Sequence, residues 1–333
     1  MGEIGSEFWD VPILSETNNL FPDNTQWFLS GRSALQAIIG DLKGCRSVAM
    51  PSYCCDSMIK PFADAGYDVH FYPVYWQDGL HCEISLDCDV LFLIDYFGYT
   101  ADVPSIRDYS GVVIRDVTHS LFSENKTDAD YYFGSLRKWC GFWTGGFCRT
   151  KDGHRLRAEN TVNEEYVALR KTAMELKKDF IAGERRRDKG FLQLFAEAEE
   201  LLEQVGPSPA DRRDIRLARK LDVSFIQRQR RANAAILREA FADDLVFREM
   251  GENDCPMFVP IFVRDGKRDA LRKYLIQQEI YCPIHWPKSD YHRLNDVTET
   301  MYTGMISLVC DQRYSEDHMR RIVSAVDTFW KEA

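Results

Sequence analysis

The chain has 333 residues, 45% of them hydrophobic and 28% charged, with a formal net charge of -10. This length allows one large domain or two of ordinary size, and the composition is that of a globular protein. The negative charge argues against a nucleic-acid partner, whose phosphates need clustered positive charge. No apolar run reaches the roughly 20 residues of a membrane span, and no basic region precedes an apolar one at the N-terminus. We therefore expect a cytoplasmic protein with neither a nucleic-acid nor a membrane partner.

Ten cysteines are scattered along the chain. None falls into the paired spacing of a zinc site, and the adjacent Cys54 and Cys55 suit neither a metal nor a disulfide. We therefore expect reduced thiols and no metal site.

The first 28 residues show neither helical nor strand periodicity and contain five aromatic side chains. We expect them to form an arm that packs on the body of the protein or on a partner subunit. A helix should follow, because apolar side chains recur on one helical face until Gly44 can end it. These side chains are Ala34, Leu35, Ile38, Ile39 and Leu42.

Short apolar runs alternate with helical segments further along the chain. The runs, which we predict to be strands, span 47–50, 69–72, 89–94, 112–114, 131–133 and 146–149, and a helix is predicted at 56–65. The run 89–94 is almost wholly apolar, as strands covered on both faces are. This alternation predicts a mostly parallel sheet flanked by helices, that is, an α/β fold.

The composition changes in the second half of the chain. Residues 155–240 are typical of long helices with polar outer faces. Beyond them, predicted strands at 256–263 and 305–309 alternate with predicted helices at 267–278 and 315–330. We therefore predict three parts, which are an N-terminal arm at 1–28, a large α/β domain at 29–240 and a smaller C-terminal α+β domain at 241–333.

The stretch from 132 to 147 contains a single lysine, Lys138, which stands three residues after Ser135 and ahead of two glycines. A lysine amine attacks a carbonyl group only in its neutral form. We expect the aromatic side chains at 139, 142 and 143 to bury Lys138 and so to favour that form. The alternative is an ordinary surface lysine after a strand.

Further segments carry groups that suit a ligand. Asp116 follows the predicted strand 112–114 and places a carboxylate at the carboxyl edge of the sheet, where α/β folds bind ligands, unless it only caps a helix. Residues 30–33, Ser-Gly-Arg-Ser, open a helix with hydroxyl groups and backbone amides that suit an anion, although a plain capped helix begins in the same way. Tyr53 could stack on a ligand ring or lie in the core.

An amine, a carboxylate and an anion site are the three groups that pyridoxal 5′-phosphate needs. The amine makes a Schiff base, the carboxylate holds the pyridinium nitrogen and the helix start binds the phosphate. The sequence therefore predicts this cofactor, with Lys138 and Asp116 as the catalytic residues.

These segments resemble the motifs of the DegT/DnrJ/EryC1/StrS family, the sugar aminotransferases of pyridoxal-phosphate fold type I. The family has a Ser-Gly-Thr-x-Ala-Leu opening, a Pro-x-x-Thr-aromatic segment, a His-x-x-Gly strand end, a Glu-Asp-x-x-Gln/His motif, and a serine ahead of the Schiff-base lysine with glycines behind. The similar segments here are 30–35, 51–55, 95–98, 115–119 and 135–146. The middle helices match poorly, so the chain looks like a divergent member.

The resemblance implies the fold of the pyridoxal-phosphate-dependent transferases and a role for each similar residue. Lys138 would form the Schiff base, Asp116 would hold the pyridinium nitrogen and His119 would contact the ring oxygen. The remaining cofactor-binding residues would be Gly31, Arg32, Ser33, Tyr53 and Ser135. The resemblance also implies a homodimer with shared active sites.

Four positions depart from the family's pattern. Arg32 stands in place of a threonine, and Arg115 stands in place of a glutamate. Cys55 stands in place of the aromatic residue that stacks on the ring, so Tyr53 would have to serve. Ser135 lies three residues before the lysine, where most of the family has it five before.

The reaction that the resemblance implies is transfer of an amino group from glutamate or glutamine to a keto-sugar nucleotide. Such an anionic substrate needs cations, for which Arg137, His285, Lys288 and the charge run 184–189 are candidates. Two alternatives stay open. One is another enzyme of the same fold, such as a lyase or a synthase, and the other is a non-catalytic relative that binds or regulates.

Overall fold

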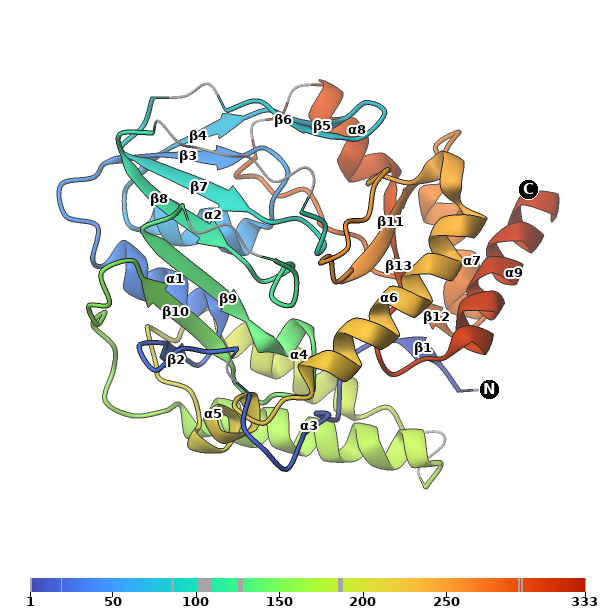
Figure 1. The fold of residues 1–333 in the computed structure, drawn as a ribbon, viewed down its shortest axis with the longest axis horizontal. Coiled ribbons are helices and arrows are strands. Elements are labelled where there is room, and N and C mark those ends of the chain that lie inside the picture. Colours follow the sequence, from blue (N-terminus) through green and yellow to red (C-terminus); the bar gives the residue numbers. More distant parts are fainter. Residues whose placement is uncertain are drawn as a thin grey trace. The chain divides into compact units, whose positions relative to one another are not determined.

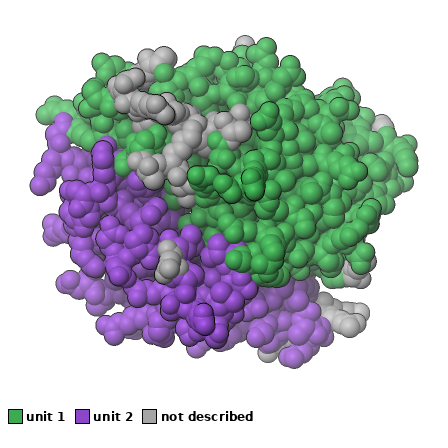
Figure 2. Space-filling model, in the orientation of Figure 1, with its two compact units in different colours: residues 1–6, 45–129, 224–333 green, residues 7–44, 130–223 purple. Residues whose placement is uncertain are grey.

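The computed structural model describes residues 2–18, 20–84, 87–100, 109–124, 128–184, 188–292, 294 and 296–332. The chain forms two compact units, of which unit 1 comprises residues 1–6, 45–129 and 224–333 and unit 2 comprises residues 7–44 and 130–223 (Figure 2). These bounds differ from the predicted ranges 1–28, 29–240 and 241–333, which stay a prediction. None of the described helices is long and apolar enough to cross a membrane.

Unit 1 contains a parallel sheet. Its strands are β3 (Ser47–Pro51), β4 (Asp68–Tyr72), β7 (Val90–Ile94) and β8 (Val112–Asp116). They lie in the order β8, β7, β3, β4 and all run parallel, as the sequence predicted (Figure 1). β7 is buried along its whole length, which explains its continuous apolar sequence. Asp116 pairs with Ile94, so β8 and β7 end level at their carboxyl edge.

Two kinds of smaller element surround this sheet in unit 1. Helix α2 (Asp56–Asp64), within the helix predicted at 56–65, packs against β4 and buries Ile59 and Phe62. The hairpin of β5 (Val74–Trp76) and β6 (Leu80–Cys82) and the helix α8 (Asp296–Gly304), which packs against β5, were not predicted.

The C-terminal part of unit 1 has a hydrophobic core of its own. Its elements are α6 (Val223–Ala240), η2 (Ala242–Asp244), β11 (Phe258–Phe262), α7 (Arg268–Gln277), β12 (Ile280–Tyr281), β13 (Met305–Val309) and α9 (Glu316–Glu332). β11 and β13 pair in antiparallel fashion, and α7 packs against α9. Helix α6 adds Ala234 and Leu237 to this core, although the prediction placed it in the large domain.

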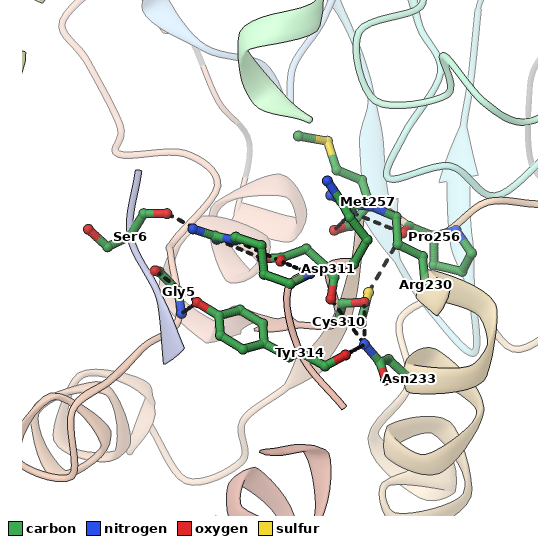
Figure 3. Close-up of polar contacts among 11 residues, drawn as sticks. Gly5, Ser6, Arg230, Asn233, Pro256, Met257, Cys310, Asp311 and Tyr314 are labelled. Carbon is green, nitrogen blue, oxygen red and sulfur yellow. Dashed lines mark hydrogen bonds and ion pairs between the residues drawn. The ribbon is translucent and has the colours of Figure 1, made fainter. Parts of the chain in front are cut away.

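Polar side chains of α6 are satisfied by backbone groups of the same unit. The buried Arg230 donates to the carbonyl oxygen of Met257 (2.9 Å), and Asn233 donates to that of Tyr314 (2.9 Å; Figure 3). The hydroxyl group of Tyr314 in turn accepts a hydrogen bond from the amide of Gly5 (2.8 Å). Buried polar groups need such partners, so these bonds fix α6 and the first residues of the chain to the C-terminal strands.

The predicted arm packs on the body of the protein at two strands. β1 (Ile4–Gly5) pairs in parallel with β12 in unit 1. β2 (Gln26–Phe28) pairs in antiparallel fashion with β10 (Gly146–Thr150) in unit 2. The arm therefore packs on its own chain. The homodimer stays a prediction.

Unit 2 contains an antiparallel group of strands. β2, β10 and β9 (Tyr131–Ser135) pair in this order, and α1 (Gly31–Ile39) packs against β9 and β10 (Figure 1). Helix α1 is shorter than predicted, because it ends at Ile39 and Gly40 caps it. Asp41, which follows this cap, accepts a hydrogen bond from Tyr131 (2.8 Å).

The predicted helices after residue 155 are present. They are α3 (Glu164–Ala182), α4 (Phe191–Leu201) and α5 (Arg212–Ala218) in unit 2. α3 and α4 pack together through Ala173 and Met174 on one helix and Phe191 and Phe195 on the other. The turn that follows β9, η1 (Leu136–Lys138), lies in the same unit.

Candidate functional site

The start of α1 lies against the strand that leads to Lys138. Ser30 caps the helix, because its Oγ accepts a hydrogen bond from the amide of Ser33 (3.1 Å). A Cβ atom at Gly31 would lie 3.5 Å from the Cβ of Ser135, so the two residues are neighbours. Unit 2 therefore brings together the predicted anion site at 30–33 and the serine ahead of the lysine.

The glycines after Lys138 have a steric role. A Cβ atom at Gly146 would lie 2.0 Å from the carbonyl oxygen of Ser30, a distance that no side chain tolerates. Gly145 has a φ of +123°, and its carbonyl oxygen accepts a hydrogen bond from the amide of Leu136 (2.9 Å). The two glycines thus allow β10 to approach the start of α1 and close the loop that carries the lysine.

Lys138 is exposed, so the prediction that aromatic side chains bury it is wrong. It is the last residue of the short turn η1, in which Leu136 points inward and is fully buried, and Trp139 beyond it is buried as well. Leu136 fills the apolar core position of this turn, and Lys138 is left at the surface. Within the described residues the amine of Lys138 makes no hydrogen bond and no ion pair within 4.0 Å.

Arg137, a predicted substrate cation, is held inside unit 2. Its guanidinium donates to the carboxylate of Glu199 on α4 and to the hydroxyl group of Tyr166 on α3, and it lies over the ring of Tyr166, 5.7 Å from the centroid. Arg170 on α3 is also buried. Sequence reasoning missed Glu199, Tyr166 and Arg170, which lie in helices that match the family poorly.

Asp116 occupies the end of β8 in unit 1 and is 3% exposed. Its Oδ1 accepts a hydrogen bond from the amide of Thr118 (2.8 Å), and the residues after it form turns rather than a helix. The alternative that Asp116 caps a helix is therefore not what the structure shows. The carboxylate lies where the sequence predicted it, at the carboxyl edge of the parallel sheet.

The neighbouring Arg115 forms a buried ion pair. Its guanidinium contacts Asp95 (2.7 Å) at the end of β7 and the half-buried Asp128 (2.7 Å). Burial raises the pKa of Asp95, although Arg115 and a hydrogen bond from Ser120 (3.0 Å) act in the opposite direction. The arginine that stands in place of the family's glutamate is thus paired with a carboxylate directly after the adjacent strand β7.

Tyr53 is buried among aromatic rings of unit 1. The centroids of Tyr96, Trp286 and Tyr302 lie 5.9, 5.2 and 5.1 Å from its own, and it has no exposed surface. Its hydroxyl group has no hydrogen-bond partner among the described residues, and burial raises its pKa. Its ring can take a ligand on its face only if one of these neighbours moves, so its predicted stacking role stays a prediction.

Trp286 connects Tyr53 with two other predicted residues. Its indole stacks on the imidazole of His119, with the centroids 5.4 Å apart and the planes at 19°. His285 meets His119 edge to face at 5.5 Å, and its Nδ1 is hydrogen-bonded to Ser307 (2.8 Å). Unit 1 therefore brings Tyr53, His119 and His285 into one aromatic cluster. Trp286 contacts all three of these rings, and sequence reasoning did not single it out.

The remaining predicted substrate cations are Lys288 and those of the charge run 184–189. Lys288 is exposed and forms an ion pair with Glu299 (2.6 Å), which is itself 46% exposed. Of the charge run 184–189, residues 185–187 lie outside the described residues.

No protein-family model and no curated protein matches the chain by sequence. Solved structures do match it. A DegT DnrJ EryC1 StrS aminotransferase from Brucella abortus is 16% identical with a TM-score of 0.61, over 92% of this chain and 85% of that one. PseC from Helicobacter pylori, an aminotransferase involved in the biosynthesis of pseudoaminic acid, is 13% identical with a TM-score of 0.62, over 98% and 100%.

A third match agrees with these two. The sugar aminotransferase CalS13 from Micromonospora echinospora is 14% identical with a TM-score of 0.59, over 92% of this chain and 87% of that one. The chain therefore has the fold of the DegT/DnrJ/EryC1/StrS aminotransferases, an α/β fold with a mostly parallel sheet flanked by helices. The fold that the sequence motifs predicted is confirmed.

Proposed function

We propose that the chain is a pyridoxal-phosphate-dependent aminotransferase that moves an amino group from glutamate or glutamine to a keto-sugar nucleotide. The observation that carries this proposal is the exposed amine of Lys138 on a turn directly after Ser135, beside the capped start of α1. The reaction class is supported by the aminotransferases that share the fold.

The side chains of each unit suit one part of the cofactor. In unit 2 the phosphate would be held by the N-terminal amides of α1, the hydroxyl groups of Ser33 and Ser135 and the guanidinium of Arg32. In unit 1 the buried carboxylate of Asp116 suits a pyridinium nitrogen, and the imidazole of His119 suits the ring oxygen.

When bound, pyridoxal phosphate supplies an electron sink that stabilises negative charge at the substrate's α-carbon. Asp116 would keep a proton on the ring nitrogen, because a carboxylate beside that nitrogen favours its charged form. The amide of Thr118 holds Asp116 in place. The amine of Lys138 would act as general base and then as general acid, taking a proton from the substrate's α-carbon and later giving it back.

For the nucleotide we propose His285 and Lys288 as contacts. The exposed ion pair of Lys288 with Glu299 is worth little in water, so Lys288 can leave it for a diphosphate at small cost. His285 has one ring nitrogen engaged with Ser307, which fixes the orientation of the other. Arg137 is a weaker candidate, because Glu199 and Tyr166 already take its donors.

The test is a visible absorption spectrum of the purified protein with pyridoxal phosphate. A band should form, glutamate should bleach it, and a nucleotide-linked keto-hexose should restore it. Reduction with borohydride followed by peptide mapping should label Lys138. The variant Lys138→Ala should lose the label, whereas Lys151→Ala should keep it, because Lys151 is an exposed lysine (72%) at a loop after β10.

Each other outcome selects a different function. Restoration by a small keto acid only would indicate an aminotransferase of another substrate class. A band that no amino donor changes would favour a lyase or a synthase. Absence of any band would favour a non-catalytic relative, and labelling of another lysine would overturn the role of Lys138.

A further inference from the structure

Two arginine side chains of unit 2 lie along the packed helices α3 and α4, one helical turn apart (Figure 1). The guanidinium of Arg137 contacts Tyr166 on α3 and Glu199 on α4. One turn away on each helix, the guanidinium of Arg170 lies over the ring of Phe195, 4.7 Å from its centroid. The two arginines therefore meet the same seam between the helices, Arg137 from the turn η1 and Arg170 from α3 itself.

These two guanidinium groups have donors left. Both Nε atoms are buried and find no acceptor in the described part of the chain. Arg170 is 1% exposed, and its terminal nitrogens make only long hydrogen bonds there, to Glu7 (3.4 Å) and to the carbonyl oxygen of Phe142 (3.5 Å). Because a guanidinium has five N–H donors and buried donors normally find acceptors, the seam can accommodate a further anionic group.

The two partners of Arg137 differ in how firmly they are held. Tyr166 is fully buried, and both its hydroxyl group and its ring contact the guanidinium. The side chain of Glu199, by contrast, is 48% exposed, whereas that of Arg137 is 9% exposed. An ion pair with an exposed carboxylate contributes little in water, so Glu199 can turn into solvent at small cost while Tyr166 keeps Arg137 in place.

A ligand that replaces Glu199 must present the group that the site binds already, which is a carboxylate at the end of two methylene groups. The side chain of the amino donor glutamate is that same group. Arg137 and Lys138 are consecutive residues of η1, with Cα atoms about 3.8 Å apart, so a donor held by Arg137 would lie beside the residue that is proposed to react with it. Glutamine ends in an uncharged amide and would gain much less from a guanidinium.

We propose that Arg137 binds the distal carboxylate of the amino donor, and that Glu199 is a displaceable carboxylate that occupies this position until the donor enters. This inference rests on the proposed function, and it selects glutamate over glutamine as the donor. Glu199 competes with the donor for one guanidinium. The competition adds selectivity, because a donor with a neutral side chain has no charge with which to displace Glu199.

The first experiment uses the chain loaded with pyridoxal phosphate and measures the donor concentration at which the rate of bleaching is half-maximal. Glu199→Gln should lower this concentration for glutamate by about 2- to 5-fold, because the competing charge is gone. Arg137→Gln should raise it by about 10-fold or more. The concentration for glutamine should change little in either variant. Glu200→Gln, at the exposed neighbour on α4, should behave as the wild-type chain.

Opposite shifts in the two partners of one ion pair distinguish this inference from a structural role. If the pair only braced η1 against α4, loss of either partner would impair the site in the same direction. Arg137→Lys keeps the positive charge but cannot contact Tyr166 and a carboxylate with one planar group, so it should give a concentration between those of the wild-type chain and Arg137→Gln.

A second measurement needs neither cofactor nor reaction. Glutarate, a dicarboxylate without an amino group, is titrated into the cofactor-free chain and its binding is followed by calorimetry. Glu199→Gln should bind glutarate more tightly than the wild-type chain and Arg137→Gln more weakly, by factors similar to those for glutamate. Glu200→Gln should again leave the affinity unchanged.

The outcomes separate this inference from the proposed function. A chain that forms no absorption band with pyridoxal phosphate defeats the proposed function, and the glutarate titration then decides on the carboxylate site alone. Weaker binding of glutarate in both Glu199→Gln and Arg137→Gln, or equal affinity in both, overturns the inference. A shift for glutamine as large as that for glutamate also overturns it, because glutamine has no distal carboxylate.

Discussion

The two sets of predicted residues differ in how the fold holds them. In unit 1 Asp116, Arg115 and Asp95 are buried at the ends of parallel strands, and each has partners within that unit. In unit 2 Lys138 is exposed at the end of a short turn, beside a pair in which Glu199 is half exposed. A change that removes a buried interaction in the first set should therefore cost stability as well as activity, whereas a change in the second should affect chemistry with little effect on the fold.

The largest stability effect is expected for Arg115→Met. The substitution leaves the buried Asp95 without its cation, and breaking a buried pair from one side costs about 3–5 kcal/mol. Urea unfolding followed by circular dichroism measures the loss.

The matched control is Arg264→Met, which removes an exposed pair with Asp244 (2.8 Å; the arginine is 64% exposed). That variant should lie within about 0.5 kcal/mol of the wild-type chain. Equal losses in the two variants would mean that the buried pair in unit 1 is no more important than a surface one, and the comparison between the units would lose its basis.

The next effect is on turnover rather than stability, in Asp116→Asn. The amide oxygen can still accept the hydrogen bond from Thr118, so the fold should remain and much of the cofactor should stay bound. The charge that keeps a proton on the ring nitrogen is lost, and a pair of charges about 4 Å apart at an effective dielectric of about 20 is worth about 4 kcal/mol before desolvation. We expect kcat to fall about 10²-fold, since desolvation takes part of that energy.

Steady-state kinetics and an absorption titration check this prediction together. A variant with near-normal kcat would reduce Asp116 to a residue that only shapes the turn at 117–118. A variant that neither folds nor binds cofactor would place it with Arg115 among the structural residues of unit 1.

The sequence predicted the elements that depend on local patterns. The strands β3, β7 and β8 were found because buried parallel strands are continuous apolar runs, and α1 was found because Ser30 and the apolar period mark its start. The hairpin of β5 and β6 was missed, because strands of three residues are too short to show a period.

Side-chain placement was harder to predict than the elements. Lys138 has aromatic neighbours in sequence, but which side chain of η1 turns inward depends on the three-dimensional turn, and Leu136 takes that position. The contact of Arg137 with Glu199 joins residues 62 apart, and Glu199 lies in a helix that carries no motif, so no local signal points to it. Trp286 could have been suspected as an aromatic residue next to His285. Its position, however, depends on contacts with the rings of Tyr53, Phe97 and His119, which lie far from it in the sequence.

The smallest expected effect is on thermal stability and concerns an exposed histidine of unit 2 that has no proposed role in the reaction. His154 lies between two carboxylates, with Asp152 2.5 Å from its Nδ1 and Asp41 2.7 Å from its Nε2. The hydrogen bond to Asp152 and then that to Asp41 raise the pKa of His154. Because the pKa of His154 is higher in the folded state than in the unfolded state, its contacts with the two carboxylates stabilise the fold fully at pH values below the unfolded pKa near 6.5. This contribution to stability is lost as the pH rises through the folded-state pKa of His154.

The variant His154→Gln should therefore melt below the wild-type chain at pH 6 and approach it by pH 9. The side chain is 39% exposed, so the difference at pH 6 should be only about 1 °C. His81→Gln is the control, because His81 contacts the carbonyl oxygen of Gln77 and, among the described residues, no carboxylate. Differential scanning calorimetry at several pH values between 6 and 9 measures both variants. A difference in melting temperature between His154→Gln and the wild-type chain that grows with pH would contradict this prediction. It would show that contacts other than the charge on His154 hold Asp152 and Asp41 together.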